Sequence, residues 1–223
     1  MSDELKYYYL KNHPLFTTLT EEQVLSICAQ VKVINMARGE MIHYGDGTLG
    51  KLYLLLKGKI KVIETDETGN ELIKDILTEG EFFGDLSLEG MTPPGEQAVA
   101  LITNTVVGWF AVSGFKDVLE HYPAVAVCYV QKVSNRLKRL EDRHADLVFR
   151  DARARLIRFI RDWARTDGSR IGDKIVLNNY LTHSDIAGFI STSRQSVNVL
   201  LNELRDSGKL SYNRKRIELT DEW

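Results

Sequence analysis

The feature that most constrains the fold is an uninterrupted helical repeat in the middle of the chain. Apolar side chains recur there at alternating steps of three and four residues, and Pro123 suits the first turn of the helix that carries them. Residues 123 to 147 would span about 38 Å at roughly 1.5 Å per residue. The predicted seam consists of Val130, Val133, Leu137, Leu140, His144 and Leu147. A narrow apolar stripe on so long a helix predicts pairing with a second copy of the chain, with packing against its own chain as the alternative.

A different pattern, of short β-rich runs punctuated by glycine, precedes this helix between about residues 33 and 112. Regular strands separated by Gly and Asp turns, with no long helix between them, predict a compact antiparallel barrel or sandwich. In front of the strands, residues 5 to 31 are expected to form short helices. Thr20 is the predicted N-cap of one of them, with Gln23 at the third helical position.

The composition is that of a globular protein, because 43% of the 223 residues are hydrophobic and 27% are charged. No stretch approaches the roughly 18 apolar residues that cross a bilayer. The N-terminal residues lack the charged-then-apolar layout of a secretory signal. We therefore expect the chain to stay in the cytoplasm, without a membrane partner.

The two cysteines, Cys28 and Cys128, lie far apart in the sequence and in apolar surroundings. Buried thiols are expected there, rather than a disulfide or a metal pair. An iron-sulfur cluster would need more thiolates than the chain has. His144 is expected to be a tolerated polar position in the seam, because no second ligand stands at metal-binding spacing on its face. No metal site is predicted.

Charge is distributed unevenly when the chain is divided after Val148. Residues 1 to 148 include 15 basic and 21 acidic side chains, whereas residues 149 to 223 include 14 and 10. The basic C-terminal third is compatible with a polyanionic partner, although an ordinary scatter of surface charge would give such an excess as well. Apolar positions at helical spacing among many arginines predict one further helix, from residue 149 to about residue 167.

The most informative stretch is residues 180 to 221, where two short helices are predicted around a brief turn. Thr182 is the expected N-cap of the first helix, which ends near Ile190. Thr192 and Gln195 predict a capping box that opens the second helix, which runs to about residue 207. The shared core of the two helices would consist of Ile186, Ala187, Ile190, Val197, Leu200, Leu201 and Leu204. This arrangement predicts a helix-turn-helix, followed by a two-stranded wing.

Exposed residues in the first turn of the second helix would face base edges in the major groove. Arg194 can donate paired hydrogen bonds to guanine, and Gln195 can bind adenine in the same bidentate way. Ser193 and Ser196 are short hydroxyl donors for phosphates or nearby bases, and Asn198 lies one turn further on. The wing adds three basic residues that can reach the sugar-phosphate backbone, Arg214, Lys215 and Arg216. These residues predict binding to double-stranded DNA.

The order of glycine-rich barrel, long helix and C-terminal helix-turn-helix resembles the cyclic-AMP receptor protein and fumarate-nitrate regulator (CRP/FNR) family over nearly the whole chain. The matching segments are Arg38-Gly39-Glu40, Leu52 to Val62, Glu79 to Leu86, and Ser193-Arg194 within the helix-turn-helix. The resemblance implies an α+β chain in three parts. These are a cyclic-nucleotide-binding-like β-barrel (a double-stranded β-helix or jelly roll) in residues 1–121, a dimerisation helix in 122–148, and a winged helix-turn-helix in 149–223. It also implies a homodimer that reads a two-fold symmetric DNA site, with RNA polymerase as a further partner.

The segment that holds the cyclic nucleotide in this family departs from the family pattern here. Gly84-Asp85-Leu86-Ser87 resembles the first half of the phosphate cassette, with aspartate where the family has a glutamate for the ribose. Gln97 stands where the family has an arginine for the cyclic phosphate, and Ala98 cannot supply the hydroxyl that follows. Losing a charged hydrogen bond of this kind costs roughly 1.5 to 3 kcal/mol. We expect these residues to line an effector pocket that does not hold cyclic AMP in the usual pose. Which effector occupies the pocket, or whether one does, stays open.

Two other classes of function compete with a DNA-binding regulator. An enzyme is not expected, because the five histidines share no metalloprotease or nucleophile spacing and neither Gly-x-Ser-x-Gly nor a phosphate-binding loop occurs. A regulatory module that binds a nucleotide or a protein without touching DNA would explain the barrel. It would not explain why Arg194, Gln195 and the basic residues of the wing occur at these positions. The sequence therefore predicts a sequence-specific transcription regulator, and this module remains the alternative.

Overall fold

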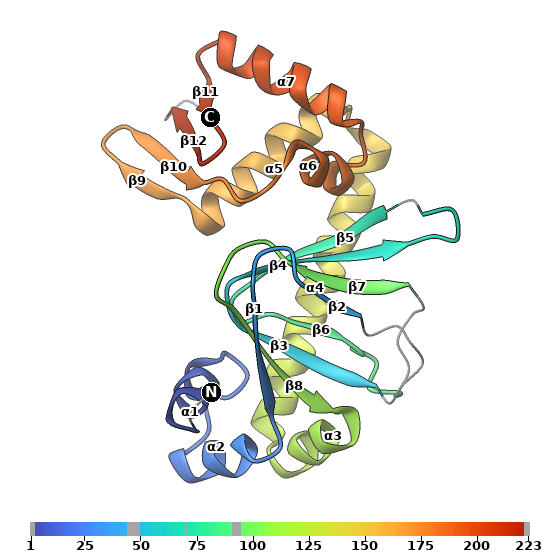
Figure 1. The fold of residues 1–223 in the computed structure, drawn as a ribbon, viewed down its shortest axis with the longest axis vertical. Coiled ribbons are helices and arrows are strands. Elements are labelled where there is room, and N and C mark those ends of the chain that lie inside the picture. Colours follow the sequence, from blue (N-terminus) through green and yellow to red (C-terminus); the bar gives the residue numbers. More distant parts are fainter. Residues whose placement is uncertain (1–2, 44–49, 70, 91–94, 221–223) are drawn as a thin grey trace. The chain divides into compact units, whose positions relative to one another are not determined.

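The computed structural model describes residues 3–43, 50–69, 71–90 and 95–220. The chain divides into two compact units, residues 1–139 and 140–223, and the division falls within the long helix α4 (Pro123–Phe149). Figure 1 shows the strands β1 to β8 in the first unit and the C-terminal helices with a smaller sheet in the second. This combination is the predicted α+β fold. The predicted domain boundaries after residues 121 and 148 stay a prediction.

Two short helices precede the strands of unit 1, as the capping pattern predicts. They are α1 (Asp3–Asn12) and α2 (Glu21–Cys28). At the start of α2, the backbone N–H of Gln23 donates to Thr20 Oγ1 over 3.3 Å, and the N–H of Thr20 donates to Gln23 Oε1 over 2.9 Å. These reciprocal bonds pair two backbone donors that would otherwise lack partners, which explains why α2 begins here.

The strands of unit 1 build two antiparallel sheets. The first has the order β1-β8-β3-β6 and the second has the order β2-β7-β4-β5. The strands are β1 Lys32–Met36, β2 Met41–His43, β3 Lys51–Lys57, β4 Lys59–Thr65, β5 Glu71–Thr78, β6 Phe82–Gly84, β7 Glu96–Ala100 and β8 Thr105–Ala111. Most neighbouring strands within a sheet come from distant parts of the sequence. This strand order is typical of a jelly roll and agrees with the predicted barrel.

Residues from both sheets meet in an apolar layer between them. This inter-sheet core consists of Met36, Tyr53, Leu55, Ile60, Val62, Leu77, Phe83, Ala98, Ala100 and Val107. A second cluster, the outer core, covers the other face of the first sheet, where Leu52, Leu54 and Phe110 meet side chains of α1, α2, α3 (Val112–His121) and α4. Alternate residues of β3 serve the two layers, because successive side chains of a strand point to opposite faces. This explains why β3 is apolar almost throughout.

The first half of α4 packs on unit 1. Tyr129 is buried in the outer core, and its hydroxyl donates to the backbone oxygen of Leu86 over 2.6 Å. Arg136 Nη1 donates to the backbone oxygen of Phe82 over 3.0 Å, and Arg136 Nε lies 3.2 Å from Asp75 Oδ2. One face of α4 is therefore fixed to its own barrel.

Unit 2 combines helices with a sheet of the order β11-β12-β10-β9. Its further elements are α5 Ala152–Asp167, β9 Ser169–Ile171, β10 Lys174–Asn178, α6 His183–Ile190, α7 Arg194–Asp206, β11 Leu210–Tyr212 and β12 Arg216–Thr220. The sequence predicts these helices and the wing strands β11 and β12, but not the hairpin of β9 and β10. That hairpin turns at Gly172, whose φ of 59° favours glycine. All three residues of β9 are exposed, so its sequence has no alternation of apolar and polar positions to reveal it.

The helix that follows α4 begins later than its sequence pattern predicts. The expected start is residue 149, whereas α4 continues to Phe149 and α5 starts at Ala152. Asp151 is the N-cap of α5, because its carboxylate accepts from the N–H of Ala154 over 2.8 Å. A capping aspartate begins a new helix here, although the apolar period runs on from α4 into α5.

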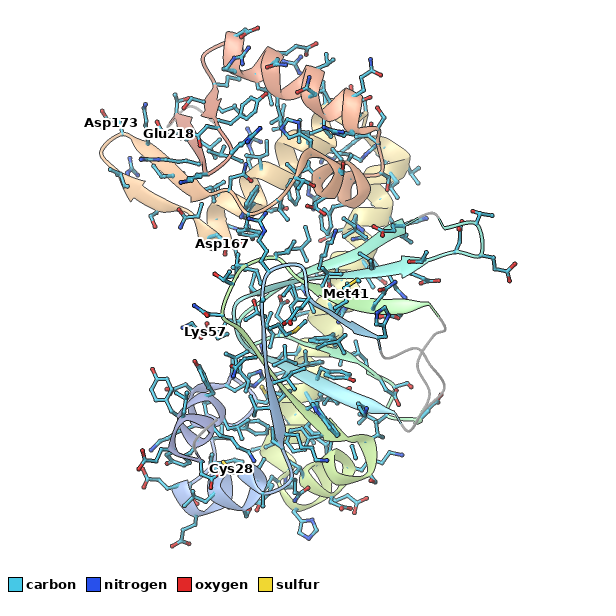
Figure 2. All side chains as sticks on the ribbon, in the orientation of Figure 1. Cys28, Met41, Lys57, Asp167, Asp173 and Glu218 are labelled. Carbon is cyan, nitrogen blue, oxygen red and sulfur yellow. The ribbon has the colours of Figure 1, made fainter. Side chains whose placement is uncertain are left out.

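No helix in the described part of the chain is both long and apolar enough to cross a membrane. Both cysteines are free, half-buried thiols. Cys28 lies on α2 (Figure 2), and the Cys128 thiol on α4 donates to the backbone oxygen of Pro14 over 3.4 Å. The prediction of unpaired thiols is confirmed, and their burial is only partial.

Candidate nucleic-acid interface

Helices α6 and α7 form a helix-turn-helix joined by residues 191–193. At the start of α6, the N–H of Thr182 donates to Asp185 Oδ2 over 2.9 Å, and the N–H of Asp185 donates to Thr182 Oγ1 over 3.1 Å. The buried residues of the two helices are Asp185, Ile186, Ala187, Ile190, Val197, Leu201 and Leu204. Leu200, also predicted for this core, is half-buried. The small side chain of Ala187, 4% exposed, suits the close crossing of two helices.

The second helix begins one residue later than the sequence predicts. Ser193, not Thr192, is the N-cap of α7, and its Oγ accepts from the N–H of Ser196 over 2.9 Å. Thr192 still belongs to the end of α6, because its N–H donates to the backbone oxygen of Ala187 over 3.0 Å. Ser191 allows this by adopting the left-handed conformation, with φ 55°. Closing the first helix in this way replaces the predicted capping box.

The predicted base-reading residues separate into two groups. Arg194, Gln195 and Asn198 are exposed on α7, and within the described chain the side chains of Gln195 and Asn198 have no hydrogen-bond partner. The hydroxyl oxygens of Ser193 and Ser196 instead lie 2.8 Å apart and share the N-terminal cap. The first group can therefore contact a ligand directly, whereas the two serines first of all hold the start of the helix.

Arg194 lies close enough to His183, at the start of α6, to affect its ionisation. The pKa of His183 lies below its ordinary value, because burial disfavours the charged ring and the Arg194 guanidinium repels the added proton. The His183 ring also contacts Tyr212 of β11, with ring centroids 5.8 Å apart. Residues from α6, α7 and β11 thus meet beside the Arg194 guanidinium.

The turn between β11 and β12 carries the three basic residues predicted for the wing. Asn213 Oδ1 accepts from the N–H groups of Lys215 and Arg216 over 2.8 and 2.9 Å, which fixes the turn. Arg214 and Lys215 are exposed. Arg216 Nε lies 3.0 Å from an oxygen of Glu218, which Figure 2 labels on the small sheet. The charge of Arg216 is therefore partly neutralised within the chain.

Arg155 of α5 holds the turn of the helix-turn-helix, a role that the sequence does not reveal. Its Nε donates to the backbone oxygen of Ile190 over 2.9 Å and its Nη2 to that of Ser191 over 3.1 Å. Its Nη1 donates to the backbone oxygen of Arg150 over 2.6 Å. The guanidinium thereby pairs carbonyls at helix ends, which lack partners within their own helices. The sequence pattern of α5 indicates which side of the helix is apolar, but not which of its arginines binds these carbonyls.

Four of the residues predicted for an effector pocket, Gly84, Asp85, Leu86 and Ser87, follow one another at the end of β6. Gly84 ends β6 with φ 90°, and a Cβ there would lie 2.5 Å from the backbone oxygen of Lys51. Asp85 is 2% exposed, and its carboxylate accepts from Ser87 Oγ over 2.8 Å and from the N–H of Gly90 over 2.6 Å. The acidic group in the position of the family's ribose ligand is therefore already bound within its own loop.

Leu86, Gln97 and Ala98 lie in surroundings different from those of Asp85. Leu86 packs against the outer core, and Ala98 is fully buried in the inter-sheet core. Gln97 points to the opposite face of β7 from Ala98, because the two residues are successive on the strand. Gln97 Nε2 donates to Thr65 Oγ1 over 3.2 Å, whereas its buried Oε1 has no hydrogen-bond partner in the described chain. The six predicted residues are thus divided among the end of β6 and the loop that follows it, the two cores and a sheet face.

A cavity of about 320 Å³ lies elsewhere in unit 1. Its lining residues are Tyr8, Tyr9, Asn12, His13, Pro14, Leu56, Lys57, Glu79 and Gly80. None of the six residues predicted for the effector pocket belongs to this lining. Among the described residues, no three His, Cys, Asp or Glu side chains are grouped so that they could hold a metal ion.

The outward face of α4 carries most of the predicted seam. The seam residues left exposed are Val130, Leu137, Leu140, His144 and Leu147. Leu137 is 56% exposed, although large apolar side chains on helices are usually covered. Val133 differs, because it is partly buried and packs against the outer core of its own barrel. Val127 and Val148, 59% and 63% exposed, extend the apolar surface along the helix.

Comparison with known protein families finds one match in the strand-rich part of the chain and another in its C-terminal part. Residues 33–122 match a cyclic nucleotide-binding domain, and residues 154–222 match a Crp-like helix-turn-helix domain. The chain is 25% identical over 212 residues to a CRP-like cAMP-activated global transcriptional regulator of Mycobacterium tuberculosis, with 93% of this chain and 92% of that protein covered. It is 28% identical over 188 residues to a global nitrogen regulator of Synechococcus elongatus, with 84% of this chain and 85% of that protein covered.

Solved structures share the fold. The c-di-GMP responsive global regulator CLP of Xanthomonas campestris matches with a TM-score of 0.75 and 16% identity, over 90% of this chain and 99% of that one. A mutant of CooA from Carboxydothermus hydrogenoformans matches with a TM-score of 0.74 and 24% identity, over 88% and 86%. The barrel and the helix-turn-helix follow one another in the order of the two family matches, with α4 between them. The chain belongs to the CRP/FNR family of transcription regulators, with a helix-turn-helix domain for DNA binding.

Proposed function

We propose that the chain acts in the cytoplasm as a homodimeric, sequence-specific regulator that presents one α7 helix to each half of a two-fold symmetric DNA site. The observation that carries this proposal is the exposed polar start of α7, formed by Arg194, Gln195 and Asn198. Arg194 binds a guanine edge and Gln195 an adenine edge, because each side chain can form paired hydrogen bonds to its base. Asn198 lies beside them for a third polar contact. The chain acts by binding, without catalysis.

Phosphate contacts come from the residues around this helix. Arg214 and Lys215 are exposed on the wing turn and supply positive charge to the sugar-phosphate backbone. Arg216 contributes less, because Glu218 already pairs with it. Ser193 and Ser196 add hydroxyl groups close to the helix start, where backbone N–H groups also favour phosphate.

Dimerisation uses the exposed apolar face of α4, in residues 122–148. Val130, Leu137, Leu140 and Leu147 are 61, 56, 43 and 42% exposed, and a second α4 would remove them from water. Residues 1–121 then form the sensory part and residues 149–223 the DNA-binding part. RNA polymerase is the further partner that we propose.

We infer that the sensory barrel responds to an effector other than cyclic AMP in the usual pose. The Asp85 carboxylate already accepts hydrogen bonds from its own loop, and Gln97 carries no charge for a cyclic phosphate. The relatives also differ by name, since one is cAMP-activated and another responds to c-di-GMP. Calorimetry with cyclic AMP and cyclic GMP should give no binding heat. Dissociation constants in the micromolar range would contradict this part of the proposal.

Selection of random DNA duplexes by the full chain tests the central proposal. We expect an enriched site with two inverted half-sites about one helical turn, roughly 34 Å, apart. Affinity for this site should fall steeply as salt rises, because phosphate contacts release counterions. Retention of all duplexes without an enriched motif would reject sequence-specific regulation. Retention of none would favour the alternative module that does not bind DNA.

A further inference from the structure

An exposed apolar side chain stands in the middle of the outer face of α7. Val199 is 49% exposed. The buried residues Val197 and Leu201 are two positions away on either side, so each points about 200° around the helix from Val199 at 3.6 residues per turn. Val199 therefore lies on the side of α7 opposite the core of the helix-turn-helix.

Helix propensity does not favour a valine in this place. A β-branched side chain loses rotamer freedom in a helix, and exposed helical positions are better served by Ala, Glu, Lys or Leu. A side chain that is 49% exposed still leaves about half of its apolar surface in water, and a partner that covers this surface would gain hydrophobic stabilisation. Val199 therefore presents apolar surface that a partner outside the chain can bury.

The neighbours of this valine leave it open towards the groove of a bound duplex. Glu203, one turn further along α7, accepts from Arg153 Nη1 over 2.8 Å, which neutralises a carboxylate that would repel DNA. Asn202 Oδ1 accepts from the hydroxyl of Tyr212 over 3.1 Å. Gln195, one turn earlier, is a proposed base reader. The valine thus follows a base-reading side chain and precedes two that are bound to the rest of unit 2.

We propose that Val199 packs against the C5-methyl group of a thymine in each half-site, and so selects thymine at that position. The inference rests on the proposed function, because it needs α7 to enter the major groove. The thymine methyl is the one apolar group that base edges present there, whereas the other groups are hydrogen-bond donors or acceptors. A valine without polar atoms can distinguish bases through that methyl group and through nothing else on the base edge.

Thymine-to-deoxyuridine substitution tests this contact, because it removes only the methyl group and leaves every hydrogen-bonding group in place. The DNA is the site enriched by the full chain, with each half-site thymine replaced in turn. Substitution at one particular thymine of the half-site should lower the affinity of the wild-type chain about fourfold. This change corresponds to the free energy of burying one methyl or methylene group. Replacing that thymine in both half-sites should cost about fifteenfold.

The variant Val199→Ala should bind thymine and deoxyuridine at this position within twofold of each other. Arg194→Ala should keep the thymine preference while losing discrimination at a different base pair. Ile171→Ala, which shortens an apolar side chain that is 58% exposed on β9, is the matched control and should retain the full wild-type pattern.

Each contrary outcome has a distinct meaning. An enriched site whose half-site contains no thymine would overturn the role of Val199 and leave DNA recognition intact. The same holds if the affinity of the wild-type chain does not change when any thymine of the site is replaced by deoxyuridine. A methyl preference that persists unchanged in Val199→Ala would also overturn it, because another residue would then make the contact. If no site is enriched, the proposed function fails, and the role of Val199 fails with it.

Discussion

Arg155 Nε lies 2.9 Å from the backbone oxygen of Ile190, the last residue of α6. The same guanidinium donates to Ser191 in the turn before α7 and to Arg150, which directly follows α4. One cation therefore joins the start of α5 and the residue after α4 to the turn at residues 190–191, which is 35 residues or more away in the sequence. Because these bonds hold the turn that leads into the recognition helix, the placement of α7 within unit 2 depends on Arg155.

Arg155→Ala should loosen the helix-turn-helix. Hydrogen bonds to charged groups contribute about 1.5 to 3 kcal/mol each, and partial exposure of Arg155 reduces this, so we expect a total loss of about 2 to 4 kcal/mol in local stability. Amide hydrogen exchange at the end of α6 and the start of α7 should become faster, and the rate in β3 and β8 of unit 1 should not change.

Two variants serve as controls for Arg155. Arg155→Lys keeps the charge but has one ammonium group in place of a forked guanidinium, so it should recover less than half of the loss. Arg165→Ala removes an arginine side chain that is 83% exposed and should change stability by less than about 0.5 kcal/mol. Equal exchange rates in Arg155→Ala and wild-type chain would show that the three hydrogen bonds do not hold the turn.

Charge in the seam should dissociate the homodimer. The double variant Leu137→Glu and Leu140→Glu places two like charges of each copy opposite those of the other in a low-dielectric interface. Sedimentation should then show monomers with an intact fold by circular dichroism. Leu72→Glu, on an exposed leucine of β5, is the matched control and should remain dimeric. A dimeric double variant would assign the interface to another surface.

Base readout and phosphate contact should separate by mutation. Arg194→Ala should lower discrimination by roughly 1 to 3 kcal/mol at one base pair. Lys215→Ala should weaken binding on all sequences alike and reduce the slope of log affinity against log salt by about 2, because the dimer loses one phosphate contact in each copy. Arg216→Ala should have a smaller effect on that slope, because Glu218 already neutralises part of its charge. Uniform weakening by Arg194→Ala in binding titrations would make Arg194 a phosphate contact.

Acid should destabilise unit 1 through His13, which is 3% exposed and accepts from the N–H of Leu15 over 3.3 Å. Burial, together with the charge of Lys132, lowers the pKa of His13 to about 3. Below an unfolded-state pKa of about 6.5, the unfolded chain binds a proton that the folded chain does not. The contribution of neutral His13 to stability is therefore complete above that pH and is lost progressively as the pH falls towards 3.

Denaturation of wild-type chain and His13→Gln at a series of pH values measures this effect. Glutamine does not titrate, so the difference in unfolding free energy isolates His13. The difference should be constant above pH 7 and should move against the wild type by about 1.4 kcal/mol for each pH unit between about 6 and 4. A difference that stays constant down to pH 4 would mean that His13 accepts a proton in the folded chain.

The sequence predicts the elements whose signals are local. The Thr20–Gln23 capping box, the long apolar period after Pro123 and the start of α6 at Thr182 all involve residues within a few positions of one another. Capping and periodicity depend on side chains of the same helix, so these features are found where they are predicted. The same locality makes Arg194 and Gln195 recognisable at the start of α7.

Tertiary structure decides what depends on distant partners. Thr192 loses the cap position to Ser193 because its N–H is needed to close α6, and Val133 turns towards its own barrel. Asp85 is bound by its loop, and Arg155 reaches carbonyls 35 residues or more away in the sequence. Hydrogen bonds and burial of this kind depend on which segments lie close together in the folded chain. Sequence periodicity does not predict which distant segments these are.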